Sequence, residues 1–550
     1  MPELRRLLAE VRANRIYPTA YRAVRRMHRR VMDGELFSAG SSTPAEIEVV
    51  AGERRDEFWA RLRERLAERA VPYTSGGSDQ EWRPRLHLRE QDAGALFEIL
   101  TELAGSARPA DSAPGVRWLL YQQGQQPHQP IEGIGRDYHR RRFTKLDLWV
   151  LERPSVAAPA RRPEGLFTVI EIDFWGSPER SFRAEPYAVA PRYNAVATSM
   201  RWRELNQLLG VDDPATRAGD LAEVDQLPDL DARDFPIDLV YTWVDDQDPN
   251  WQAIKNEHLP DGSKITVGEG RADHAERFRN RDELKYSLRS IEMFAPFVRN
   301  IYLVTMDQTP AWLNTDHPQL TVVSHSDIYA DPQALPTFNS SSIETQLHHI
   351  NGLAEQFIYF NDDVFLGRPC SWRDFFWANG AAKYFPATHT VSANLIDDHA
   401  EEYLVADRNA IRLLEAEFGR SAHAGMMHTP HPSRRSVLQE LEKKYPDQFA
   451  DCASSRFRSR QDLRPIAFFG HHYGFATGRA MPAEISNRYL ALWKPQIAAQ
   501  LANVLRTRKY KTFCINDVGV TDDREDEVNR QVGSFLDAYF PLPSRFERAG

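Results

Sequence analysis

The sequence predicts an α/β fold for residues 237–550, with a Rossmann-like, mainly parallel sheet covered by helices. The first observation is that short apolar segments alternate in this region with segments of helical periodicity. The second is that two apolar segments end in polar turns, Trp243-Val244-Asp245-Asp246 and Asn361-Asp362-Asp363. Ligands of such folds bind at the carboxyl ends of the strands, so we expect both turns at the functional edge of the sheet.

Two helices of this region are expected to begin with a capping box. Asn280-Arg281-Asp282-Glu283 has this form, and Ser341-Ser342-Ile343-Glu344 has it again. A cap would by itself explain why residue 344 is acidic. The expected strands are residues 237–244, 301–305, 320–324 and 357–360.

The rest of the 550-residue chain divides into three further parts. Residues 1–31 form a basic amphipathic arm, which predicts either contact with an anionic membrane surface or a helix packed on its own domain. Residues 32–209 predict an α+β domain without a chemical motif, strand-like at 118–121, 145–151 and 166–175 and helical at 91–103 and 197–209. Residues 210–236 predict an acidic linker before the core.

Composition excludes several classes of protein. With 69 Lys+Arg against 78 Asp+Glu, the net charge is −9, which argues against a nucleic-acid-binding surface. The three cysteines lie far apart in the sequence, so neither a disulfide framework nor a thiolate zinc site is expected. No apolar stretch approaches the length of a membrane span and no signal-peptide core is visible, so the protein is expected in the cytoplasm.

Several polar residues suit chemistry on a phosphate. Asp362 and Asp363 could hold magnesium against a diphosphate, although adjacent acids after a strand are also ordinary turn residues. His428 is either a general base or a structural histidine. Arg458 offers a guanidinium fork for phosphate oxygens or belongs to a solvated face. Trp243 stacks on a base or fills the core, and spacing alone favours the core.

Two adjacent histidine pairs, His348-His349 and His471-His472, are not assigned to a metal. Neighbouring side chains point in different directions on regular elements, so convergence on one ion is not expected.

Several segments, taken together and in order, resemble the four conserved blocks of the Stealth family. The blocks span about residues 237 to 547 and leave the first 230 or so residues outside the resemblance. The segments are residues 237–245 for the first block; 277–278, 282–291, 335–340, 343–344 and 359–363 for the second; 428–431 with 456–458 for the third; and 513–517 with 540–547 for the fourth.

That family contains bacterial capsular and exopolysaccharide phosphotransferases and the animal N-acetylglucosamine-1-phosphotransferase. The resemblance implies a glycosyltransferase-like fold and transfer of a sugar-1-phosphate from a nucleotide sugar to a glycan hydroxyl, with release of a nucleoside monophosphate. It implies Mg²⁺ or Mn²⁺ as cofactor, and a nucleotide-sugar donor and a glycan acceptor as partners. The resemblance leaves three questions open: whether the acceptor is lipid-linked, whether the protein contacts the inner face of the cell membrane, and whether it forms a homodimer.

The family's functional residues carry over by position. The resemblance implies that the metal lies on Asp363 with Asp362 beside it, and that Glu344 orients the histidine, the acceptor or the metal. The expected catalytic residues are Glu344, Asp363, His428 and Arg458, and the expected substrate-binding residues are Trp243, Asp245, Asn339 and Ser340.

Two alternatives belong to other classes of protein. A metal-dependent glycosyltransferase would use a similar sheet and acidic turn but would release a nucleoside diphosphate. A non-catalytic sugar-nucleotide or glycan-binding protein would bind the donor and form no product. The leaving group therefore separates all three functions.

Overall fold

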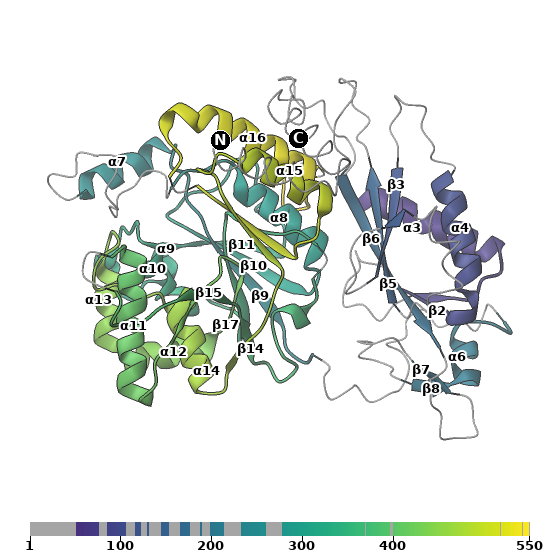
Figure 1. Cartoon of the computed structure of the whole chain (residues 1–550), viewed down its shortest axis with the longest axis horizontal. Coiled ribbons are helices and arrows are strands. Elements are labelled where there is room, and N and C mark those ends of the chain that lie inside the picture. Colours follow the sequence, from purple (N-terminus) through teal and green to yellow (C-terminus); the bar gives the residue numbers. More distant parts are fainter. Residues whose placement is uncertain are drawn as a thin grey trace, which may run out of the picture.

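The computed structural model describes residues 51–75, 85–105, 116–122, 129–130, 145–152, 165–176, 187–189, 199–213, 233–259 and 278–548, the last without 369, 397–399, 518 and 542. The basic arm expected at residues 1–31 lies outside the described residues, as does most of the expected linker. Figure 1 shows a core sheet between two groups of helices, with a second sheet beside it.

The core sheet is mainly parallel, as the alternation of strands and helices predicts. Within the described residues its spatial order is β11 (Leu320–Ser324), β10 (Val298–Thr305), β9 (Ile237–Thr242), β12 (Gln356–Asn361) and β17 (His431–Arg434). Only β17, at the edge, runs antiparallel to its neighbour. The central strands β9 and β12 are buried on both faces, which explains their largely apolar sequence.

Helices from both halves of the core sequence cover this sheet (Figure 1). On one side lie α8 (Glu283–Phe294), α15 (Ile497–Thr507) and α16 (Asp522–Tyr539). On the other lie α9 (His325–Ile328), α10 (Ser340–Glu344), α11 (Glu402–Phe418), α12 (Arg435–Lys444), α13 (Pro446–Ser454) and α14 (Gly470–Ala476). None of the described helices is both long and apolar enough to cross a membrane.

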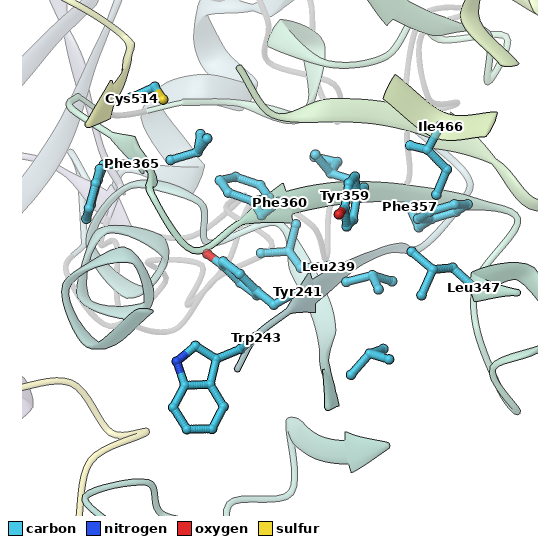
Figure 2. Close-up of a cluster of buried hydrophobic side chains, with 14 of the residues drawn as sticks. Leu239, Tyr241, Trp243, Leu347, Phe357, Tyr359, Phe360, Phe365, Ile466 and Cys514 are labelled. Carbon is cyan, nitrogen blue, oxygen red and sulfur yellow. The ribbon is translucent and has the colours of Figure 1, made fainter. Parts of the chain in front are cut away.

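Large aromatic side chains fill the centre of the core (Figure 2). Tyr241 on β9 and Phe360 on β12 lie 5.2 Å apart between ring centroids, and both are almost fully buried. Trp243 extends from the end of β9, apart from the other labelled side chains, and is 7% exposed. Close packing in the core therefore holds rigidly the two strands that carry the predicted turns.

A small second sheet in the core brings the C-terminal part of the chain to the end of β12. β13 (Val364–Leu366) pairs antiparallel with β20 (Thr512–Asn516), which pairs parallel with β19 (Asn487–Ala491). Since β13 begins directly after Asp363, this pairing places β20 beside the acidic turn. The remaining core elements are α7 (Pro249–His258), β14 (Ala382–Tyr384), β15 (Pro386–Thr390), β16 (Ala424–Met426) and β18 (Ala480–Pro482).

The N-terminal region is α+β, as predicted. Its sheet has the order β1 (Thr74–Ser75), β2 (Arg85–Arg89), β6 (Gly165–Trp175), β5 (Lys145–Glu152), β3 (Val116–Gln122) and β4 (Gln129–Pro130) among the described residues. It is accompanied by α3 (Ala51–Glu68) and α4 (Ala93–Gly105), and β6 lies beside α8 and α16 of the core. The helix expected at residues 197–209 is instead β8 (Ser199–Arg201), paired with β7 (Tyr187–Val189), followed by α6 (Trp202–Leu208).

Both predicted capping boxes are wrong. Asp282 is the N-cap of α8 but lies in the left-handed region, with φ 62°, and its side chain caps nothing. Helix α10 begins after Asn339, whose side chain accepts a hydrogen bond from Ser341 N at 3.1 Å. Glu344 therefore ends α10, and its carboxylate is available for contacts elsewhere.

Candidate active site

The strand order creates a switch point between β9 and β12. The chain passes from β9 to β10 on one side, whereas β12 pairs with β9 on the other. Thr242 is in register with Asn361, so Asp245 and Asp362 follow at the same edge of the sheet. Ligands of open α/β sheets bind in the crevice at such a point.

Four carboxyl groups influence one another at this edge. Burial and the charge of Asp363 raise the pKa of Asp362 to about 7, and burial likewise raises the pKa of Asp363 to about 7. Glu283, at the start of α8, also acts on Asp363, and its own pKa is raised by burial and by Asp362 to about 8. Asp517, which follows β20, is the fourth group.

This concentration of acids fits a hard divalent cation. The nearby guanidinium groups of Arg279 and Arg281 are paired with Asp517, at 3.2 and 2.8 Å, and so compensate Asp362 and Asp363 little. Because their pKa values are raised to about 7, Asp362 and Asp363 are partly protonated at neutral pH. A divalent cation would replace those protons. The residues present therefore suit the magnesium ion that the resemblance implies.

The small sheet fixes the conformation of Asp363. Ile515 N donates to Asp363 O at 2.9 Å, and the Cys514 thiol donates to Asp363 Oδ2 at 3.2 Å. Cys514 is fully buried, and burial raises its pKa, so it stays a thiol. It therefore orients one carboxylate oxygen and leaves the other to a ligand.

Glu344 is buried at the end of α10. Its Oε2 accepts hydrogen bonds from Ile466 N at 2.9 Å and Ala467 N at 3.1 Å. Burial raises its pKa, and the charges of Arg464 and Arg458 oppose this shift. The carboxylate thus connects α10 to the segment after Arg464.

The loop that carries Arg458 is attached to the residues before α10. The fully buried Asn339 donates its amide to Asp462 Oδ2 at 2.9 Å, and Phe338 stacks on Phe457 with centroids 5.1 Å apart. Arg458 Nη2 then reaches the hydroxyl of the half-buried Ser340 at 3.3 Å. Asn339 holds this loop in place, and Ser340 and Arg458 lie at its accessible end.

His428 lies before β17 and packs on an aromatic ring. Its ring centroid is 4.9 Å from that of Tyr489 on β19, and its main-chain oxygen accepts a hydrogen bond from Asn487 at 3.1 Å. The ring is exposed to solvent, yet the surrounding protein and the charge of Arg464 lower its pKa to about 4. At neutral pH the ring is therefore uncharged.

Shared neighbours connect the expected catalytic residues. Tyr359, at the centre of the sheet, has its pKa raised by burial and by the charges of Glu344 and Asp362, and Arg458 opposes this. Arg464 acts on both Glu344 and His428. On the other side, the pKa of Tyr489 is raised by burial and by the charge of Asp363. Glu344, Asp362 and Arg458 therefore share Tyr359 as a neighbour, and Glu344 and His428 share Arg464.

The first block lies at the same edge but is more deeply packed. Gln308 holds the turn by accepting from Asp245 N at 3.0 Å and donating to Asp245 O at 2.9 Å. The side chain of Asp245 is half-buried and caps the next turn through Gln247 N at 3.0 Å. Trp243 belongs to the hydrophobic core, as its spacing favours.

Sequence reasoning assigned no role to Glu283, Arg464, Tyr489, Cys514 or Asp517. Glu283, Cys514 and Asp517 lie inside segments that resemble the family, but their side chains gave no chemical pattern of their own. Arg464, which pairs with the buried Asp407 at 2.9 Å, and Tyr489 carry no local signal at all.

The fold and this region define an α/β protein with a cluster of buried acidic residues at a topological switch point. The chain belongs to the Stealth protein family. Residues 235–257, 277–384, 427–475 and 502–550 match, in order, Stealth protein conserved regions 1, 2, 3 and 4.

The chain matches its relatives over only part of their length. The chain is 37% identical over 506 residues to an exopolysaccharide phosphotransferase of Streptomyces coelicolor, covering 88% of this chain and 50% of that protein. It is 42% identical over 395 residues to another from the same organism, covering 70% and 65%. Capsular polysaccharide phosphotransferase SacB of Neisseria meningitidis serogroup A is 38% identical over 336 residues, with 60% of each chain covered. The chain thus spans about half to two thirds of these relatives.

Solved structures show only a remote likeness. A galactosyltransferase, LgtC, in complex with donor and acceptor sugar analogues, is 9% identical with a TM-score of 0.27, covering 54% of this chain and 95% of that one. A likeness this weak carries no argument about the site.

Proposed function

We propose that the protein is a capsular or exopolysaccharide phosphotransferase that moves a sugar-1-phosphate from a nucleotide sugar to a glycan hydroxyl. Two observations support this proposal: the charges of Glu344, Asp362 and Arg458 all act on Tyr359, and His428 packs on Tyr489, on which the charge of Asp363 acts. Such a reaction develops negative charge on phosphoryl oxygens while a poorly acidic hydroxyl attacks. Cationic groups and a proton acceptor are the parts it requires.

Arg458 is proposed to bind the phosphoryl oxygens. Its guanidinium lies beside the hydroxyl of Ser340, at 3.3 Å, in a loop that Asn339 fixes. A guanidinium can donate two parallel hydrogen bonds to a phosphate, which orients it as well as attracting it. Ser340 would add a further hydroxyl, whereas Asn339 would act by holding the loop.

Asp363 and Asp362 are proposed to hold Mg²⁺ or Mn²⁺. The ion would neutralise charge on the diphosphate of the donor and on the departing nucleoside monophosphate. The thiol of Cys514 would keep the Asp363 carboxylate in one orientation. Asp245 and Trp243, at the end of the neighbouring strand, are proposed to lie near the nucleotide.

His428 is proposed to take the proton from the acceptor hydroxyl. With a pKa near 4, the ring is neutral and ready to accept a proton at neutral pH. The negative charge of a bound donor would raise this pKa and so make the ring a stronger base. Glu344 is proposed to be a positioning residue, since Oε2 binds two main-chain N–H groups next to Arg464.

The proposal is tested by the products formed. Nucleotide sugars are incubated with the full chain, Mg²⁺ and a glycan acceptor, and phosphorus NMR is used to detect a new phosphodiester. Chromatography identifies the nucleotide released. A nucleoside monophosphate with a diester is the expected result. A nucleoside diphosphate would indicate a glycosyltransferase, and donor binding without any product would indicate a binding protein.

The parts outside the core are assigned by proposal only. We propose that residues 32–209 form a separate domain and that residues 1–31 dock on anionic lipid near a glycan acceptor, which could be lipid-linked. Deleting residues 1–31 should then abolish sedimentation with anionic liposomes but keep turnover of a soluble acceptor. Unchanged sedimentation would dismiss the docking role.

A further inference from the structure

The adjacent histidines His348 and His349 face the same carboxylate, contrary to the expectation that they diverge. They lie on the one-turn helix η7 (Leu347–His349), and Glu442 lies on α12. Nε2 of His348 is 2.9 Å and Nε2 of His349 is 3.1 Å from the same oxygen, Oε2 of Glu442. In this tight turn the two rings lie only 4.1 Å apart between centroids.

The hydrogen bonds of this cluster require either an additional proton or a metal ion between His349 and Glu442. Nδ1 of His349 lies 2.9 Å from the main-chain oxygen of Ile328, which can only accept, so Nδ1 carries the proton. In the neutral ring, Nε2 then points a lone pair at the carboxylate oxygen of Glu442. Two acceptors at 3.1 Å repel each other unless a proton or a metal ion lies between them.

We propose that His348, His349 and Glu442 form a binding site for a divalent transition metal of the zinc type. Two imidazole nitrogens with one carboxylate oxygen are a ligand set that Zn²⁺ uses, with a fourth position for water. These three ligand atoms lie within 4.8 Å of one another. Donation from His349 Nδ1 to a main-chain carbonyl is the arrangement that fixes a metal-binding tautomer.

The surroundings allow such an ion to enter and be held. His348 is fully buried, whereas the side chains of His349 and Glu442 are 29% and 34% exposed, so the site opens to solvent on one side. Within the described residues, Nδ1 of His348 has no hydrogen-bond partner, so either ring nitrogen can carry its proton. The nearby Arg435 donates to the main-chain oxygen of His348 at 2.9 Å, so its guanidinium is directed at the backbone.

The position of the cluster indicates what the ion would do. His348 lies four residues after Glu344, and α12 follows the strand that begins just after His428. An ion bound by both segments would link the segment that follows Glu344 to the helix that follows His428, and so stabilise the positions of these two proposed active-site residues. This role is structural, and it does not depend on phosphotransfer being the reaction.

The site is tested with Co²⁺ as a spectroscopic probe. The full chain is stripped with a chelator and titrated with Co²⁺, and intense visible bands of tetrahedral Co²⁺ with nitrogen ligands are expected at one equivalent. Addition of Zn²⁺ should remove the bands and raise the melting temperature. In His349→Ala and Glu442→Gln we expect the Co²⁺ affinity to fall by more than about 100-fold, because losing a ligand costs more than losing its outer partner.

Two controls make the result decisive. His258→Ala, which removes a histidine near the end of α7, should keep the bands. Asp363→Asn should also keep them, since oxygen ligands of the acidic edge give only weak Co²⁺ absorption. Bands that persist in His349→Ala would overturn the proposal. So would their absence from the wild-type chain, because a proton would then lie between His349 and Glu442.

Discussion

The imidazole of His428 packs on the ring of Tyr489, with centroids 4.9 Å apart and ring planes at 47°. Tyr489 is in register with Cys514, whose thiol donates to Asp363. A single exposed aromatic residue therefore lies between the proposed base and the proposed metal ligand. This relationship gives Tyr489 a testable part in positioning the histidine.

Two substitutions of Tyr489 distinguish the contribution of its ring from that of its hydroxyl. Tyr489→Ala removes the surface on which His428 rests, and we expect kcat to fall by about 10- to 100-fold, since small displacements of a reacting group cost this much. Tyr489→Phe keeps the ring and should retain nearly full activity. Steady-state kinetics decide, with Trp377→Ala, another exposed aromatic, as control. Equal losses in both Tyr489 variants would contradict the packing role.

The depressed pKa of His428 predicts the acidic limb of the pH profile. An ordinary histidine would be protonated below about pH 6.5, whereas this ring, with a pKa of about 4, stays neutral there. At metal concentrations that keep Asp362 and Asp363 ionised, kcat/KM should not fall until below about pH 5. A limb near pH 6.5 would show that another group acts as the base. His428→Ala should lower kcat by roughly 10²- to 10⁴-fold.

Arg458 is expected to act through the geometry of its guanidinium. Arg458→Ala removes donors to the phosphoryl oxygens and should lower kcat by roughly 10²- to 10³-fold. Arg458→Lys keeps the charge but loses the fork, so its activity should lie between those of wild type and Arg458→Ala. Arg460→Ala, at an exposed residue of the same loop, is the matched control and should be active. Full activity of Arg458→Lys would mean that charge alone suffices.

Metal binding is expected to fail together with turnover in Asp363→Asn. The substitution keeps the shape of the side chain but removes the charge that a divalent cation requires. Isothermal titration with Mg²⁺ should show binding in the wild type and none in the variant. Asp316→Asn, at an exposed loop residue, should behave as wild type. A variant that is active and still requires magnesium would place the ion elsewhere.

Local sequence patterns predicted the four parallel strands of the core sheet, but neither its edge strand β17 nor the strand order. Leu320–Ser324 was predicted to the residue, although it is an edge strand on which Thr321 is exposed. That β12 pairs with β9 opposite β10 depends on long-range contacts, which no local pattern contains. The start of α8 was missed for a similar reason. Asp282 takes a left-handed conformation. The neighbouring Arg281 donates hydrogen bonds to Asp517 and Asn529, which are distant in the sequence.

The residues proposed for the site came from resemblance rather than from spacing. His428 and Arg458 lie 65 and 95 residues after Asp363, so only the family's block order suggested that they belong together. Tyr489 and Arg464 escaped because an aromatic or an arginine is common on any surface. The convergence of His348 and His349 escaped because a tight single turn does not separate adjacent side chains as a regular helix does.

Glu344 offers a test that reads stability as well as turnover. In Glu344→Ala, the buried N–H groups of Ile466 and Ala467 lose their acceptor. Leaving a buried donor unsatisfied costs roughly 1–3 kcal/mol, so the free energy of unfolding should fall by at least about 2 kcal/mol. Glu344→Gln keeps an oxygen acceptor and should lose less. Urea unfolding of both variants, with circular dichroism, measures the difference.

The sign of the pH dependence distinguishes a buried, ionisable Glu344 from a simple hydrogen-bond acceptor. Burial raises its pKa above the ordinary value of 4.5, so the folded protein holds the proton more tightly than the unfolded chain. The contribution of this group to stability is therefore present below pH 4.5 and is lost as the pH rises through the folded-state pKa. Glu344→Gln cannot ionise, so its stability relative to wild type should increase between acidic and alkaline pH. A difference that does not change with pH would show that Arg464 and Arg458 fully compensate the carboxylate.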